Sequence, residues 1–333
     1  MTPPSSPSPD QPVGEVPDVG DVGDVRDDRQ SGNGDKRALV LAGAGAAGNA
    51  WELGLVAGLA ESGVDVTDAE LVIGTSAGST VAAQLTSGTP PADLYAAILA
   101  EVPPSPAGGA GRGAGRGAGR PPRVSGPDYL DWSNKIIAAA EDAADMRRRM
   151  GAAALELDAS GGSGGSDGTR WRDIVASRLP SPHWPQQRVL VTAVNAHTGE
   201  PVVFDRHSGV DLVDAVAAST SAMTPYPIGA HRYINGGYRR SENADLATGY
   251  GRVLILSPFS GRTRMPLEWG MDLATQVAEL RAGGSRVETV FPDERSGDVF
   301  GANALDPSTR LPAARGGYDQ GRARAGALRG FWL

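Results

Sequence analysis

Residues 70–85 read ELVIGTSAGSTVAAQL and combine a short apolar run, a turn with two glycines and a helix-forming segment. The apolar run is typical of a buried strand. The turn fits the pattern G-x-S-x-G, in which the glycines Gly74 and Gly78 relieve the steric conflict of a sharp strand-to-helix turn. Its serine, Ser76, then lies at a helix N-terminus, which stabilises a developing alkoxide. The stretch predicts Ser76 as a nucleophile, with a purely structural turn as the alternative.

A second strand–turn–helix pattern precedes this one. Residues 37–42 (RALVLA) read as a buried strand, residues 48–62 have helical spacing, and the turn between them is Gly43-Ala44-Gly45-Ala46-Ala47-Gly48. This G-x-G-x-x-G turn is compatible with a dinucleotide-binding fingerprint. It is equally compatible with backbone amides that stabilise an oxyanion, or with a tight turn that binds nothing.

The two turns together are more informative than either alone. Adjacent βα units bring both turns to the carboxyl edge of one sheet, where open α/β folds place their sites. An acyl-transfer site uses such a pair, because one turn supplies amides and the other supplies the serine. A dinucleotide site expects an acidic residue at the end of the second strand, whereas Asp65 and Asp68 precede that strand.

Further along the chain, apolar strands alternate with helical segments. We expect helices at residues 79–86, 92–101, 129–157 and 271–281, and strands at residues 188–194, 201–205, 252–257 and 287–291. This alternation predicts a mostly parallel sheet covered on both faces, that is, a three-layer α/β/α sandwich. We expect one domain over residues 37–330, with helical insertions between its second and third strands.

Three segments are low in complexity. Residues 1–36 are rich in Pro, Gly and Asp and carry eight acidic and three basic residues, so they hold −5 of the net charge of −8. We expect this tail to be disordered, because it has too few large apolar side chains to offset the ordering entropy. Residues 103–126, which contain GGAGRGAGRGAGRPPR, and residues 158–169 have the composition of flexible linkers.

Composition excludes several function classes. The chain of 333 residues has no Cys and four scattered His, which argues against disulfides, thiolate or His-rich metal sites and a cysteine nucleophile. Its acidic balance argues against a nucleic-acid partner. No apolar run is long enough to span a bilayer, and the N-terminus lacks the apolar core of a signal peptide. We therefore expect a cytoplasmic protein without a metal ion or cofactor.

Residues 38–87 and 214–248, with ALVLAGAGAAGNAWELGLVAGL, ELVIGTSAGSTVAAQL, DAVAASTSAM and YINGGYRRSENADLA, resemble the bacterial patatin-like phospholipases. The resemblance extends over roughly residues 38–257. Members of this family hydrolyse acyl esters of phospholipids and other lipids with a Ser–Asp dyad that needs no His. The resemblance implies a patatin-like fold, Ser76 as the nucleophile and an oxyanion turn made of Gly43, Ala44, Gly45 and Gly48. Gly236 and Gly237 would support the dyad loop.

The chain departs from this pattern at residue 235, where the dyad Asp would stand, because that residue is Asn. An amide cannot accept the serine proton at pH 7, although it can orient Ser76 by a hydrogen bond. Hydrolysis is then weak or absent, unless Asp245, Glu242 or His231 serves as the base. Alternatively, the Asn235-Gly236 pair deamidates slowly to Asp. The oxyanion turn also has Ala46 and Ala47 where many members carry a basic residue.

Three functions remain open from the sequence. The first is a serine acyl hydrolase on lipid or other esters, the second a lipid-binding protein without turnover, and the third a dinucleotide-binding protein that uses only the first turn. An enzyme acting on lipids must reach an interface, so a transient contact with a membrane surface is compatible with the first. Apolar residues of the helical insertion form either a lid or, as we favour, part of the core. These residues are Ile136, Ile137, Met146 and Met150.

Overall fold

The computed structural model describes residues 35–101, 126–160, 168–301 and 303–333. Nearly all of the predicted acidic tail (1–36) lies outside the described residues, as do most of the low-complexity segments at 103–126 and 158–169. The described ends of the segment 158–169 belong to helices, because α5 (Ala143–Ser160) ends within it and α6 (Thr169–Ala176) begins within it.

The described residues form one eight-stranded sheet with the strand order β5-β6-β3-β2-β1-β7-β8, and β4 also pairs with β3. Strands β3, β2, β1, β7 and β8 are parallel, whereas β4 and β6 run antiparallel to β3, and β5 runs antiparallel to β6. The predicted α/β fold with a mostly parallel sheet is confirmed. The strands are β1 (Arg37–Leu41), β2 (Leu71–Gly74), β3 (Arg188–Asn195), β4 (Pro201–Phe204), β5 (Tyr226–Ile228), β6 (His231–Asn235), β7 (Arg252–Leu256) and β8 (Arg286–Val290).

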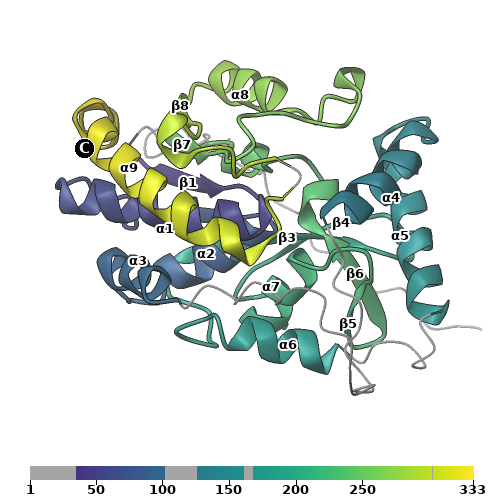
Figure 1. Ribbon diagram of the computed structural model, residues 1–333. Coiled ribbons are helices and arrows are strands. Elements are labelled where there is room, and N and C mark those ends of the chain that lie inside the picture. The colour runs from purple at the N-terminus through teal and green to yellow at the C-terminus, as the bar shows by residue number, and fades with distance from the viewer. Residues whose placement is uncertain (1–34, 102–125, 161–167, 302) are drawn as a thin grey trace, which may run out of the picture.

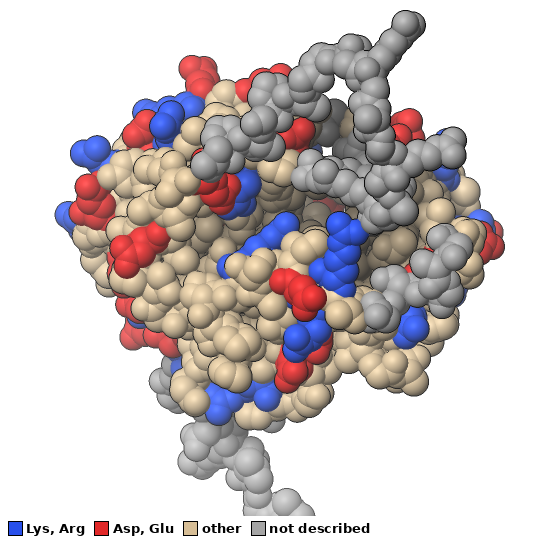
Figure 2. Space-filling model, turned by 60° about the horizontal axis from the view of Figure 1, so that its bottom comes forward, with Lys and Arg blue, Asp and Glu red and all other residues tan. Residues whose placement is uncertain are grey.

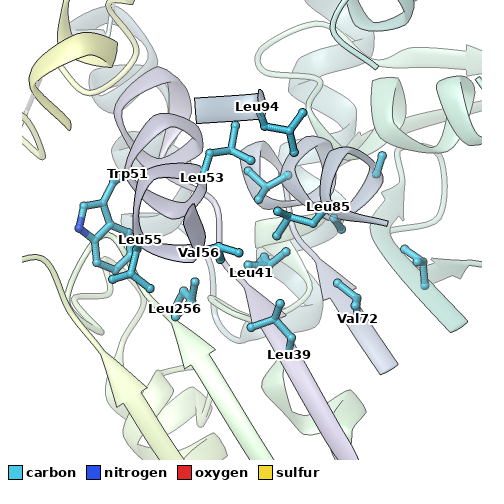
Figure 3. Packing of buried hydrophobic residues seen from close by; sticks show 14 of the residues in the cluster. Leu39, Leu41, Trp51, Leu53, Leu55, Val56, Val72, Leu85, Leu94 and Leu256 are labelled. Carbon is cyan, nitrogen blue, oxygen red and sulfur yellow. The ribbon is translucent and has the colours of Figure 1, made fainter. Parts of the chain in front are cut away.

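Helices cover both faces of this sheet (Figure 1). Alternate residues of each central strand face opposite layers, so Leu39 and Leu41 pack under α1 while Ala38 and Val40 pack toward α8. Figure 3 shows Leu39 and Leu41 beneath the apolar side chains of α1. The remaining α-helices of the described ranges are α1 (Gly45–Glu61), α2 (Ala77–Leu85), α3 (Pro91–Leu99), α4 (Gly126–Ala138), α7 (Leu212–Ser219), α8 (Leu273–Ala282) and α9 (Arg310–Trp332).

The C-terminal helix α9, which the sequence did not predict, packs along α1 (Figure 1). The two backbones approach so closely that a Cβ on Gly54 would lie 2.1 Å from the Ala314 oxygen. On the other helix, a Cβ on Gly317 would lie 2.3 Å from the Trp51 oxygen. Glycine has a low helix propensity. The glycines that allow the two helices to pack closely therefore also weaken the sequence signal for α9.

Two expectations about local structure were wrong. Residues 129–157 form two helices, α4 and α5, because the chain breaks at residues 139–142 and the Asp142 carboxylate accepts a hydrogen bond from the Asp145 amide. Residues 232–238, expected as a loop, contain most of strand β6. The core interpretation of the helical insertion is confirmed for Ile137, Met146 and Met150, which are buried, and Ile136 packs against the same cluster while partly buried.

Glu52 lies in α1 with no exposed surface, and its carboxyl oxygens have no hydrogen-bond partner among the described residues. Burial raises the pKa of this carboxyl well above its usual value, and the nearby Ala42 amide opposes the rise. The folded state therefore holds the Glu52 proton more tightly than the unfolded state does. This contribution to stability is complete below the unfolded pKa and is lost as the pH rises toward the folded pKa.

We expect Glu52→Gln to raise the free energy of unfolding by about 1–3 kcal/mol at pH 8, and to have little effect at pH 4. Urea unfolding at both pH values measures this difference. Glu156→Gln, which changes an exposed glutamate of α5, is the matched control. If Glu52→Gln raised the free energy of unfolding equally at pH 4 and pH 8, this result would contradict the raised pKa of Glu52.

Candidate active site

Ser76 lies between the end of β2 and the start of α2 and has a positive φ of 53°. Such a conformation is strained for a residue with a side chain, and here the packing of the turn enforces it. A Cβ on Gly78 would lie 2.1 Å from the Leu41 oxygen, and a Cβ on Gly74 would lie 2.5 Å from the Ser79 Cα. The Ser76 amide donates to the buried Ser219 hydroxyl at 2.9 Å. The turn thus holds the serine in one fixed position.

Asn235 is the last residue of β6, and its Nδ2 donates to Ser76 Oγ at 2.9 Å. Its Oδ1 accepts a hydrogen bond from the Gly237 amide at 2.9 Å. Strand β3 aligns the two residues, because Val191 pairs with Gly74 and Ala193 pairs with Asn235. The structure therefore brings together the two residues that the sequence singled out as a dyad.

The glycines after Asn235 shape its loop. A Cβ on Gly236 would lie 2.2 Å from the Thr192 oxygen, so the loop lies directly against β3. A Cβ on Gly237 would lie 3.2 Å from Asn235 Oδ1, close to the atom that its own amide binds. Both glycines allow the Asn235 side chain to turn back toward Ser76.

Asn243, which the sequence analysis missed, joins these parts beneath the site. This buried residue places its Nδ2 2.9 Å from Thr75 Oγ1, 3.2 Å from Thr192 Oγ1 and 3.1 Å from the Gly236 oxygen. Its Oδ1 accepts from Arg239 Nη1 at 2.8 Å. One side chain therefore connects the serine turn, strand β3 and the Asn235 loop. Its sequence signal is weak, because SENADLA reads as an ordinary polar loop.

The G-x-G-x-x-G turn lies against the serine. A Cβ on Gly43 would be 2.7 Å from Ser76 Cβ, and Gly45 has a positive φ of 58°. The Gly48 amide donates to the Ala44 oxygen at 2.9 Å, so Gly48 contributes the shape of the turn rather than a free donor. In the described part of the chain, the amides of the run 43–46 and of Ala77 have no hydrogen-bond acceptor. Backbone amides without an acceptor are the kind of donor that an oxyanion requires.

Both turns, Ser76 and Asn235 line one cavity of about 1010 Å³. This volume lies at the upper end of the usual range for small-molecule sites. Aromatic and aliphatic side chains make up much of its wall, including Trp171, Phe259, Phe300 and Leu305. An acyl chain could therefore occupy apolar surface beside the serine.

The structure brings none of the three candidate replacement bases to Ser76. His231 is exposed at the far end of β6, about 13 Å along the strand from Asn235. The Glu242 carboxylate accepts a hydrogen bond from Ser257 Oγ at 2.9 Å, and burial raises its pKa. Asp245 binds Arg239 through two bonds of 2.9 and 2.7 Å. None of the three residues lines the cavity.

The dinucleotide alternative finds no acidic residue in the required place. Asp65 and Asp68 precede β2, and Asp68 forms an ion pair of 3.1 Å with Arg37 at the start of β1. Both acids therefore lie at the edge of the sheet opposite the G-x-G-x-x-G turn. Within the described ranges, no three His, Asp or Glu side chains are grouped to hold a metal ion. No helix in those ranges has the length and apolar character needed to cross a membrane.

Comparisons with known proteins place the chain in a family. The chain is similar in structure to VipD from Legionella pneumophila, with 15% sequence identity and a TM-score of 0.41, over 88% of this chain and 67% of VipD. It also matches the type III effector protein ExoU, with 15% identity and a TM-score of 0.31, over 86% of this chain and 54% of ExoU. The chain thus spans only about half to two thirds of these proteins. No curated protein matches the sequence. A family model described as patatin-like phospholipase matches residues 39–248, more than half of the sequence, so the chain belongs to the patatin-like phospholipase family.

Proposed function

We propose that the protein is a serine acyl hydrolase that acts on lipid or other carboxylic esters through an acyl-enzyme on Ser76. The observation that carries this proposal is the position of Ser76 Oγ at a helix N-terminus, beside unpaired backbone amides and inside a large cavity. Membership of the patatin-like phospholipase family supports lipid hydrolysis in general. No metal ion or cofactor enters the proposed chemistry.

In the proposed reaction, Ser76 Oγ attacks the ester carbonyl carbon and the carbonyl oxygen becomes an oxyanion. The amides of Gly43, Ala44, Gly45 and Ala77 stabilise that charge as it develops. The tetrahedral intermediate then expels the alcohol and leaves an acyl group on Ser76, which water later removes. The serine proton must leave during the attack, and this step is where residue 235 matters.

Asn235 limits the rate of this chemistry. Its Nδ2 points a hydrogen at Ser76 Oγ, so the amide donates to the serine and cannot accept its proton. An Asp with the same orientation would place a carboxylate oxygen at that distance and still accept the hydrogen bond from the Gly237 amide. The protein as it stands is then a slow hydrolase, because solvent has to take the proton.

We expect Asn235→Asp to raise turnover of a p-nitrophenyl ester by about 10²–10⁴-fold, because general-base catalysis contributes an effect of this size. Ser76→Ala should abolish turnover and also labelling by a fluorophosphonate. The matched control is Asn49→Asp, which adds a carboxylate to the same cavity beside Arg310 and not in hydrogen-bond contact with Ser76. A folded Asn235→Asp protein that is no more active than the wild type would argue against a dyad at this position.

A patatin-fold lipid-binding protein without turnover is the second candidate. It is favoured by the absence of an unpaired acid in the described cavity wall, where Glu101 is bound to Arg310. This candidate predicts that lipid binding survives Ser76→Ala and that the wild type gives no fluorophosphonate labelling at Ser76. Labelling of the wild-type serine would exclude it.

The hydrogen bonds of Asn235 also bear on deamidation. Conversion requires the Gly236 amide nitrogen to attack the Asn235 side-chain carbonyl, but both ends of that side chain are held by Gly237 and Ser76. We expect Asn235 to remain an amide in aged protein, as measured by peptide mass mapping. Ser76→Ala, which frees Nδ2, should deamidate faster. Rapid conversion of Asn235 to aspartate in the wild type would contradict this expectation.

Asn243 is proposed as a positioning residue, because it reaches Thr75 and Gly236 at once. We expect Asn243→Ala to lower the free energy of unfolding by about 1–3 kcal/mol, since it leaves buried polar groups unpaired. In the Asn235→Asp background it should also lower kcat more than it raises KM, because Ser76 and residue 235 lose their alignment. If Asn243→Ala destabilised the Asn235→Asp protein but left its kcat unchanged, Asn243 would have only a structural role.

A further inference from the structure

The wall of the active-site cavity contains an excess of arginine. Its charged residues in the described part of the chain are Glu101, Arg178, Arg262, Arg264 and Arg310. Arg310 binds both carboxylate oxygens of Glu101, at 2.7 and 2.8 Å. These two residues neutralise each other and leave three arginines to consider.

Arg262 and Arg264 are held in place by neutral groups. Arg262 donates to the backbone oxygens of Phe259 and Phe300, at 2.9 and 3.0 Å. Arg264 donates to Ser133 Oγ at 2.6 Å and to Asn134 Oδ1 at 2.9 Å. Among the described residues, the hydrogen-bond partners of these two guanidinium groups are all neutral. Both side chains keep exposed surface and have no carboxylate partner in the described part of the structure.

Arg178 is the third cation and comes from the segment that follows α6. Its guanidinium lies 5.5 Å from the centre of the Trp171 ring and forms no ion pair in the described part of the structure. The side chain keeps exposed surface. Partial burial lowers the pKa of Arg178 and the positive charge of Arg310 lowers it further, whereas the negative charge of Glu101 raises it. An anion bound beside Arg178 would stabilise its charged form.

The charges elsewhere on the molecule are arranged differently. On the face in Figure 2, basic and acidic side chains are interspersed rather than segregated. Outside the cavity, some arginines pair with carboxylates, as Arg37 does with Asp68 at 3.1 Å and Arg239 with Asp245 at 2.7 Å. The described wall of the cavity, by contrast, contains four arginines and a single glutamate, so its net charge is positive.

We propose that Arg178, Arg262 and Arg264 form a subsite for the anionic group of the ligand, a phosphate or similar oxyanion, so that the cavity selects esters with a net negative charge. Guanidinium groups suit this task because they present several donors to an oxyanion at once. The oxyanion turn itself carries no cation, since Ala46 and Ala47 occupy it. That the ligand is an ester rests on the proposed function. The anion subsite does not depend on turnover.

The test measures binding in Ser76→Ala protein, which cannot form an acyl-enzyme. Titration calorimetry compares dihexanoyl phosphatidic acid, dihexanoyl phosphatidylcholine and dihexanoylglycerol, which share their acyl chains and differ in charge. We expect phosphatidic acid to bind at least about 10-fold more tightly than dihexanoylglycerol, with phosphatidylcholine between them and with the preference falling as salt rises. Inorganic phosphate is titrated alone and as a competitor.

Single substitutions then locate the subsite. Arg178→Gln, Arg262→Gln and Arg264→Gln should each weaken phosphatidic acid binding about 3–10-fold and leave dihexanoylglycerol binding unchanged. Arg322→Gln on α9, outside the cavity, is the matched control and should change neither. Circular dichroism and thermal melting confirm that each variant is folded.

Equal binding of the charged and uncharged ligands by Ser76→Ala protein would overturn the proposal, as would equal losses for both ligands in the arginine variants. If inorganic phosphate displaces phosphatidic acid only at millimolar concentration, and phosphatidic acid binds more tightly than phosphate, the anion comes from a lipid headgroup. Phosphate that binds as tightly as phosphatidic acid supports the same subsite with free phosphate as its ligand. If Asn235→Asp has no esterase activity while the arginine effects persist, the proposed function fails and the anion subsite stands.

Discussion

The close approach of the Ser76 turn to the end of β1 is the constraint on which the site depends. At Gly78 the turn meets the Leu41 carbonyl so closely that no side chain fits there. In this turn Ser76 has a positive φ, and α2 begins at the next residue. The G-x-G-x-x-G turn follows β1 directly and lies against the serine, because a Cβ on Gly43 would be 2.7 Å from Ser76 Cβ. The end of β1 thus contacts the Ser76 turn and also carries the turn whose amides lie near it.

A second constraint is the pairing of β3 with both β2 and β6. Because the partners of Gly74 and Asn235 on β3 are two residues apart, a shift of register in either strand would separate Ser76 from Asn235. Asn243 secures this alignment from below through Thr75 and Thr192. The hydrogen bonds of Asn243 inside the core therefore help to set the distance between Ser76 and Asn235 at the surface of the cavity.

The sequence was sufficient where the signal is local. The alternation of apolar strands and helical segments predicted the mostly parallel sheet, and the glycine patterns predicted the strand-to-helix turns, because each segment depends on a few neighbouring residues. The helix α9 was missed, since its glycines are explained only by its contact with α1. Asn243 and the three cavity arginines were missed for the same reason. Their roles arise from contacts between distant segments, and no short pattern distinguishes them from ordinary polar residues.

The charge of the cavity connects the Asn at position 235 with the arginines. An Asp there would give Ser76 a base, but it would also place a carboxylate in the wall that Arg178, Arg262 and Arg264 share. Like charges repel, so that carboxylate would oppose an anionic ligand. On the proposed function, Asn235 leaves the positive charge of the three arginines unopposed but provides no base for the serine proton. The proposal therefore has the amide favour binding over turnover, and single substitutions separate the two properties.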